Sequence, residues 1–195
     1  GNHRFLFAMS TESTETETSS PLKQLKVLSY NIDGLNNAED ELQERMMYIL
    51  GIILSQSPHV IHLQEVVPQA LASLYKTLQK NGYECSINPM DRTALMSLGG
   101  YFTLSFVKKD IPNLTQLMFQ RQLFTTPQSQ SQQGRYIQKT SFQINDIKYM
   151  FINCHLESCG TAFKSAESST RQAQLRVMLD LINSWRTEGP GIVAG

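Results

Sequence analysis

Three short polar clusters follow segments that the sequence predicts as strands, and their side chains are the ones that could carry chemistry. The clusters are Asn31-Ile32-Asp33-Gly34, Gln64-Glu65 and His155-Leu156-Glu157-Ser158. In layered α/β proteins, side chains at the carboxyl ends of strands converge on a crevice without disrupting the core, and sites are usually assembled there. The sequence therefore predicts one site built from all three clusters.

Each cluster taken alone also has a structural explanation. Asn31, placed before Asp33-Gly34, can simply build a turn. Glu65 can be a solvated strand end or a helix cap, and His155 can be a hydrogen-bonded core histidine. The occurrence of all three clusters in one chain favours the functional interpretation.

The elements that must position these clusters follow from the hydrophobic pattern. Segments rich in β-formers predict strands at residues 25–31, 59–65, 83–87, 100–108, 114–124, 135–145, 147–154 and 191–195. Apolar residues at helical spacing predict helices over residues 39–56, from Pro68 to the stop at Asn81-Gly82, and over about residues 167–185. Asn145-Asp146 predicts a hairpin turn. Hairpins beside β-α-β units predict an α/β fold with mixed sheets.

The composition excludes several classes of function. Lys plus Arg and Asp plus Glu both number 17, so a binder that relies on total positive charge is excluded. Cys85, Cys154 and Cys159 lack CxxC spacing, so neither a zinc site nor a disulfide framework is expected, and a reducing compartment fits. No apolar stretch approaches the roughly 18 residues that span a bilayer, so no membrane association is predicted.

The first 22 residues are expected to form a disordered tail. Residues 10–20 consist only of Ser, Thr and Glu, which cannot bury apolar surface. The apolar patch at residues 5–8 is too short for a signal peptide. The globular part is expected over residues 23–195, and its final apolar run before Gly195 resembles a buried strand whose following loop is missing.

Four motifs in their order resemble the endonuclease/exonuclease/phosphatase superfamily. They are SYNIDGL at residues 29–35, HLQEV at 62–66, GGYFTLSFVKK at 99–109 and CHLES at 154–158. Within the superfamily, the combination is most similar to the 5′-tyrosyl-DNA phosphodiesterases, which open 5′-phosphotyrosyl bonds. The resemblance covers residues 25–195, nearly all of the globular part.

The resemblance implies a fold, an activity and partners. The fold would be a four-layer α/β sandwich, two mixed β-sheets flanked by helices, with the C-terminal part of the catalytic domain missing. The activity would be a Mg²⁺-dependent phosphodiesterase, with Mn²⁺ as the alternative metal, that removes tyrosyl adducts of trapped type II topoisomerase in DNA repair. The implied partners are DNA with a 5′-phosphotyrosyl end, the topoisomerase II-derived peptide and signalling proteins, and the implied location is the nucleus and also the cytoplasm.

The resemblance also assigns roles to single residues. Glu65 matches the Glu that binds the metal, and Asp33 would lie in or next to the metal shell. Asn31 takes the place of the Asn that contacts the scissile phosphate. His155 takes the place of the His that stabilises charge on the phosphoryl oxygens, with Ser158 as a further phosphate donor.

Two further residues are candidates for substrate binding. Tyr101, in the GYFT segment, would line the substrate side of the cleft, and Arg135 falls where the family has basic contacts. Phosphodiester hydrolysis needs a cation, fixed donors around the phosphoryl oxygens and a base that aligns a water. A tyrosyl leaving group has a pKa of about 10, so its departure needs less protonation than that of a sugar alkoxide.

The sequence departs from the family pattern in three respects. Tyr30 stands where the family commonly has Trp. The family usually has an Arg close behind the HLES motif that holds the nucleic-acid backbone, whereas this sequence has Cys159-Gly160-Thr161 there. The affinity for DNA is therefore in question. The family's Asp-x-Asn and Ser-Asp-His motifs, which align the attacking water and stabilise the phosphoryl oxygens, are absent from residues 1–195, so these residues alone are expected to be inactive.

Two other functions stay open. One is an apurinic-site endonuclease or another nuclease of the superfamily, against which the GGYFT segment and the HLES motif argue. The other is a non-catalytic interaction protein on the same fold, against which the joint presence of Asn31, Glu65 and His155 argues.

Overall fold

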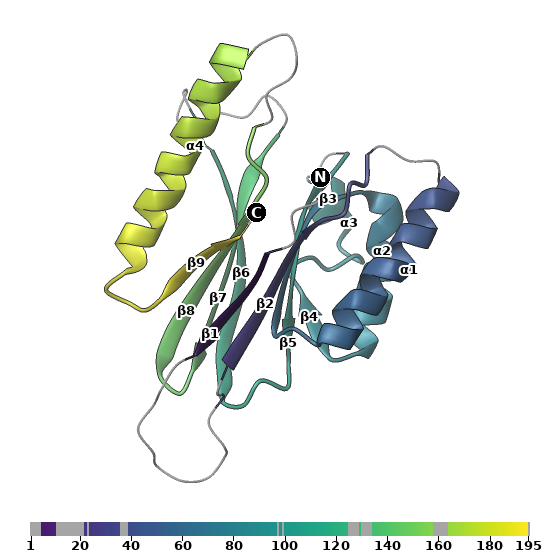
Figure 1. The fold of residues 1–195 in the computed structure, drawn as a ribbon, viewed down its shortest axis with the longest axis horizontal. Coiled ribbons are helices and arrows are strands. Elements are labelled where there is room, and N and C mark those ends of the chain that lie inside the picture. The colour runs from purple at the N-terminus through teal and green to yellow at the C-terminus, as the bar shows by residue number, and fades with distance from the viewer. Residues whose placement is uncertain are drawn as a thin grey trace.

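The computed structural model describes residues 5–10, 22, 24–35, 39–96, 98, 100–124, 129, 134–157 and 164–194. In chain order the elements are β1 (Phe5–Ser10), β2 (Gln24–Asn31), α1 (Glu39–Gln56), β3 (Val60–Val66), α2 (Pro68–Lys80), β4 (Tyr83–Cys85), α3 (Arg92–Met96), β5 (Phe102–Lys108), β6 (Leu114–Leu123), β7 (Tyr136–Ile144), β8 (Ile147–Cys154), α4 (Lys164–Trp185) and β9 (Gly191–Ala194). They form two β-sheets face to face, with α1 and α2 outside one sheet and α4 outside the other (Figure 1). The predicted four-layer α/β sandwich is confirmed.

Both sheets are mixed. The first has the strand order β1-β2-β3-β5-β4, and the second has the order β6-β7-β8-β9. The parallel pairs are β2 with β3, joined through α1, and β8 with β9, joined through α4; the other neighbours are antiparallel. Because β2 and β3 are parallel, their carboxyl ends lie at the same edge of the first sheet.

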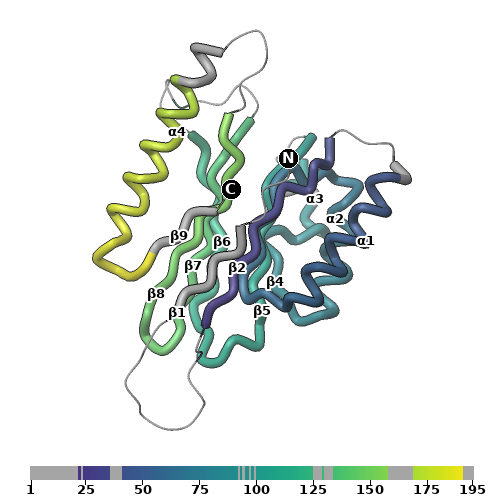
Figure 2. Tube along the Cα trace, viewed as in Figure 1, coloured from purple at the N-terminus to yellow at the C-terminus, as the bar shows by residue number. Residues whose placement is uncertain are grey.

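Three buried apolar clusters fill the spaces between the four layers. The first, with Ile53 and Leu74, lies between the first sheet and the helices α1 and α2. The second, with Val60 and Phe151, lies between the two sheets. The third includes Met178 and holds α4 on the second sheet, an arrangement that the trace in Figure 2 also shows.

The local signals that were predicted to start and stop elements act as expected. Pro68 occupies the first turn of α2, and Gly82, with a φ of +85°, follows the end of that helix. Asn145 and Asp146 both have positive φ, as a tight hairpin turn requires. No helix in the described ranges is long and apolar enough to cross a membrane.

The structure corrects the sequence-based assignments at several points. Phe5–Ser10, expected within the disordered tail, form β1 and pair with β2, because their apolar and β-forming residues suit an edge strand. The short helix α3 was not predicted. Not every apolar residue of the predicted helix over residues 39–56 is buried: Met47 and Leu54 of α1 are exposed.

Candidate active site

The turn after β2 holds Asn31 in the site. Asn31 Oδ1 accepts a hydrogen bond from the backbone N–H of Asp33 at 2.8 Å, and Asn31 Nδ2 donates to Glu65 Oε1 at 3.0 Å. Arg45 of α1 donates to the carbonyls of Ile32 and Asp33 at 3.3 and 2.7 Å, which braces the turn. Asn31 therefore builds the turn and also reaches Glu65.

Glu65 lies on a β-bulge near the end of β3. The register between β3 and β5 shifts between Leu63 and Val66, and Glu65 has a φ of 55°, which is uncommon for a residue without a short polar side chain. A bulge bends its strand and can re-aim a side chain. Here the Glu65 carboxylate lies against Asn31 and His155.

Gly34 lets the turn approach this bulge. A Cβ at position 34 would lie 2.3 Å from the Glu65 carbonyl oxygen and 3.1 Å from the Val67 side chain. A residue without a Cβ is needed where two backbones come this close. Gly34 therefore sets how near the turn lies to Glu65.

His155 follows β8 and faces Glu65 from the other sheet. Its Nε2 lies 3.5 Å from Glu65 Oε1, and its Nδ1 accepts a hydrogen bond from Arg135 at 2.5 Å. Because a guanidinium can only donate, the neutral ring carries its proton on Nε2, on the Glu65 side. Burial lowers the pKa of His155, and the charge of Arg135 lowers it further, against the opposing effect of Glu65. The imidazole is therefore a neutral donor.

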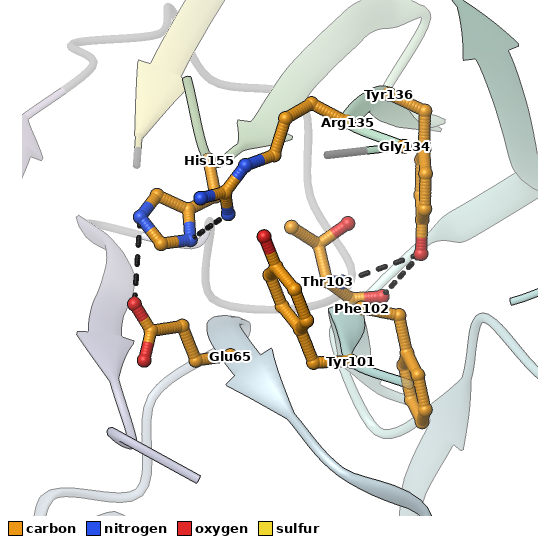
Figure 3. A pocket seen from close by; sticks show the side chains of 8 residues that line it. All are labelled: Glu65, Tyr101, Phe102, Thr103, Gly134, Arg135, Tyr136 and His155. Carbon is orange, nitrogen blue, oxygen red and sulfur yellow. Dashed lines mark hydrogen bonds and ion pairs between the residues drawn. The ribbon is translucent and has the colours of Figure 1, made fainter. Parts of the chain in front are cut away.

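Tyr101 and Arg135 form one wall of the cleft. The guanidinium carbon lies 4.8 Å from the centroid of the Tyr101 ring, and this ring meets His155 edge-on with 6.5 Å between centroids. Figure 3 shows these side chains and Glu65 around one small cleft, which Tyr136 also lines. Burial raises the pKa of Tyr101, and Arg135 opposes this rise. At neutral pH the wall is an uncharged phenol with a guanidinium on its face.

The cleft offers one open carboxylate oxygen to a metal. Oε1 of Glu65 contacts Asn31 and His155, whereas no hydrogen bond or ion pair from the described residues reaches Oε2. Within the described ranges, no group of three or more His, Cys, Asp or Glu is placed to hold a metal. Mg²⁺ at phosphate-processing sites takes one or two carboxylates, several waters and the substrate phosphates. The residues present fit an ion held in this way.

The structure brings most of the predicted site residues together. Contacts or the shared cleft connect Asn31, Glu65, Tyr101, Arg135 and His155. Asp33 joins them through its backbone, and its carboxylate lies 3.7 Å from Arg45. Ser158 lies outside the described residues.

Residues that the sequence did not single out hold the cleft in shape. The Tyr136 hydroxyl of β7 accepts a hydrogen bond from the Thr103 N–H of β5 and donates to the Thr103 carbonyl, both at 3.2 Å, which connects the two sheets. Gln174 of α4 accepts from the Glu157 N–H at 2.9 Å and donates to the Ser129 carbonyl at 3.2 Å. The helix thereby holds Ser129, which precedes Arg135 in the chain, and Glu157, which follows His155.

Comparison with known proteins identifies the fold through solved structures. No protein-family model and no curated protein matches the sequence. A D. rerio TDP2 humanized by 14 mutations matches with a TM-score of 0.69 and 25% identity, over 88% of this chain and 65% of that chain. D. rerio TDP2 complexed with single-strand DNA product matches with a TM-score of 0.63 and 25% identity, over 87% and 58% of the two chains.

A third structure extends this similarity beyond TDP2. The human Nocturnin catalytic domain with bound sulfate matches with a TM-score of 0.65 and 18% identity, over 87% of this chain and 62% of that chain. The chain thus spans 58–65% of the length of these three structures. All belong to the endonuclease/exonuclease/phosphatase superfamily, and the chain has the fold of that superfamily.

Proposed function

We propose that the chain belongs to a metal-dependent phosphodiesterase that hydrolyses 5′-phosphotyrosyl bonds on DNA and leaves a 5′-phosphate. The observation that carries the proposal is the contact of both Asn31 and His155 with Glu65, which lines the cleft. The superfamily fold supports a phosphodiesterase, and the TDP2 matches, one of them complexed with single-strand DNA product, support a DNA substrate.

Glu65 is the residue that would hold the metal. Its Oε2 would bind Mg²⁺, with Mn²⁺ as the alternative, and Asp33 would lie next to the metal shell. Bound there, the cation would neutralise charge on the phosphoryl oxygens. Asn31 keeps Oε1 engaged and so directs the other carboxylate oxygen, and its amide would contact the scissile phosphate.

His155 would supply a fixed donor to the phosphoryl oxygens. Arg135 donates a hydrogen bond to Nδ1, so the proton stays on Nε2 and points to the Glu65 side of the cleft. A donor that is already oriented costs no reorganisation when charge develops in the transition state. Ser158 would add a second donor three residues further along the chain.

The Tyr101–Arg135 wall supports a tyrosyl leaving group. A guanidinium stacked on an aromatic ring presents both apolar surface and positive charge. A substrate tyrosine needs both, because its ring must pack while its phenolic oxygen gains negative charge as the bond to phosphorus breaks. We extend the proposal to a topoisomerase II-derived peptide as the natural leaving group, to signalling proteins as further partners, and to DNA repair in the nucleus and the cytoplasm.

The test uses the full-length product of the gene that encodes these residues. With Mg²⁺ and a 5′-phosphotyrosyl oligonucleotide, we expect release of tyrosine and a 5′-phosphate. Glu65→Gln should abolish release, whereas Glu84→Gln, which changes an exposed carboxylate on β4, should not. Cleavage of a matched abasic duplex instead would indicate an apurinic-site nuclease, and DNA binding without any cleavage would indicate an interaction protein; both results contradict the proposal.

A further inference from the structure

A buried side-chain amide, that of Asn153, connects the two sheets next to the site. Asn153 of β8 is fully buried. Its Nδ2 donates to the carbonyls of Leu63 and Leu104 at 3.2 and 3.0 Å, and its Oδ1 accepts from Gln64 Nε2 at 2.8 Å. One side chain of the second sheet therefore bonds to both β3 and β5 of the first.

Two of these bonds go to Leu63 and Gln64, at the bulge of β3 that carries Glu65. Leu63 is the last regularly paired residue before the register shift, and Gln64 follows it. The Gln64 carbonyl accepts from the Ile32 N–H at 3.0 Å, so the same bulge also contacts the turn of Asn31. On the other side, Asn153 precedes His155 by two residues. The Asn153 amide therefore bonds to Gln64, the neighbour of Glu65, and lies two residues from His155 in the chain.

We propose that Asn153 is a positioning residue that fixes the separation between Glu65 and His155 across the two sheets. The inter-sheet cluster with Val60 and Phe151 is apolar, and apolar packing is non-directional. Hydrogen bonds in a buried and satisfied network are directional and select one arrangement. The effect of Asn153 on turnover rests on the proposed function, whereas its effect on the positions of Glu65 and His155 does not.

The first test measures backbone hydrogen exchange by NMR in the full-length protein. Asn153→Leu keeps the branching and the number of heavy atoms of the side chain and removes its donors and acceptor. We expect the backbone amide hydrogen of Ile32 to exchange at least about tenfold faster. This amide bonds to the Gln64 carbonyl, and in the variant Gln64 loses its side-chain hydrogen bond to residue 153. The Leu114 amide, bonded to Ile111 at the opposite end of the second sheet, should keep its rate.

The matched control is Thr140→Val. Thr140 is also fully buried in the second sheet, but its hydroxyl has no hydrogen-bond partner among the described residues. This variant should exchange like the wild type at both amides. Equal acceleration at Ile32 and Leu114 in Asn153→Leu would show a general loss of stability and overturn the inference, as would an unchanged rate at Ile32.

Turnover gives an independent readout. With the 5′-phosphotyrosyl oligonucleotide, Asn153→Leu should lower kcat by about tenfold to a hundredfold with little change in KM, because a displacement near 1 Å has this effect on a catalytic geometry. An unchanged kcat would overturn the catalytic part. If the wild type cleaves no such substrate, the proposed function fails, and the exchange rates still decide whether Asn153 positions the bulge.

Gln64→Leu serves if Asn153→Leu does not fold. This variant removes the side-chain amide whose Nε2 donates to Asn153 and Ser29. It should accelerate exchange of the Ile32 amide and spare Leu114. The wild-type rate at Ile32 would overturn the inference.

Discussion

Arg135 determines which nitrogen of His155 carries the proton. The guanidinium donates to Nδ1, so the neutral imidazole presents Nε2–H to the side where Glu65 lies. Burial and the positive charge both disfavour a doubly protonated ring. Arg135 and His155 both also contact the Tyr101 ring. The same contacts therefore orient the imidazole donor and form the surface that would recognise an aromatic group.

Removing this donor should slow the reaction rather than weaken binding. In the full-length protein, His155→Ala is expected to lower kcat on the 5′-phosphotyrosyl oligonucleotide by about a hundredfold to a thousandfold, the usual effect of deleting one transition-state donor. His59→Asn, which changes the residue just before β3 and outside the cleft lining, should stay within about twofold of the wild type. A loss of less than tenfold in His155→Ala would remove this role from His155.

His62 makes the stability of the fold dependent on pH. Its ring is fully buried, Nδ1 contacts Ser105 Oγ at 2.9 Å, and burial lowers its pKa to about 3 from 6.5. Below pH 6.5 the unfolded chain therefore binds a proton that the folded chain does not. Stability is complete above the unfolded pKa and falls as the pH drops from 6.5 toward 3, by about 1.4 kcal/mol per pH unit for one proton.

Urea unfolding at pH 7 and pH 5 measures this dependence. The wild type should lose more stability between the two values than His62→Asn, because the variant lacks the buried imidazole while His59 and His155 are retained. Equal losses in the two proteins would show that His62 does not contribute.

At the scale of elements, the site depends on the contact between the turn after β2 and the bulge of β3. Gly34→Ala would place a Cβ 2.3 Å from the Glu65 carbonyl oxygen, so the turn or the bulge must move. We expect a loss of about 1–3 kcal/mol of stability from overpacking, together with weaker Mg²⁺ binding measured by calorimetry.

Gly51→Ala is the matched control for this substitution. Apart from its own helix backbone and chain neighbours, a Cβ at position 51 of α1 meets no described residue within 4 Å. Alanine in a helix interior stabilises by about 0.5–1 kcal/mol relative to glycine. Gly51→Ala should therefore raise the unfolding midpoint and leave Mg²⁺ binding unchanged. Wild-type stability and wild-type Mg²⁺ affinity in Gly34→Ala would contradict the close approach of the turn at Gly34 to the Glu65 carbonyl.

The strands, the hairpin and the motif residues could be predicted from sequence because each leaves a local pattern. Alternation marks the strands, Asn145-Asp146 marks the hairpin, and polar residues at strand ends mark Asn31 and Glu65. Asn153 leaves no such pattern, because the Gln64 that it bonds lies 89 residues away in sequence. Arg45 and Gln174 were likewise missed, since a polar residue on a helix is ordinarily a solvated one.

At the scale of the whole molecule, the site is divided between two sheets. Glu65 and Asn31 come from the first sheet, whereas Arg135 and His155 come from the second. Their separation therefore depends on the packing between the sheets and on cross-sheet bonds such as those of Tyr136 and Asn153. A change far from the cleft that shifts one sheet against the other should affect the reaction.

The most direct test of the two-sheet site is diffraction from crystals of the full-length gene product with Mn²⁺ and a 5′-phosphorylated oligonucleotide. Anomalous scattering should place an ion in contact with Glu65 Oε2, and the 5′-phosphate should lie between that ion and His155 Nε2, against the Tyr101–Arg135 wall. An ion bound away from Glu65, or a phosphate bound away from His155, would contradict the account.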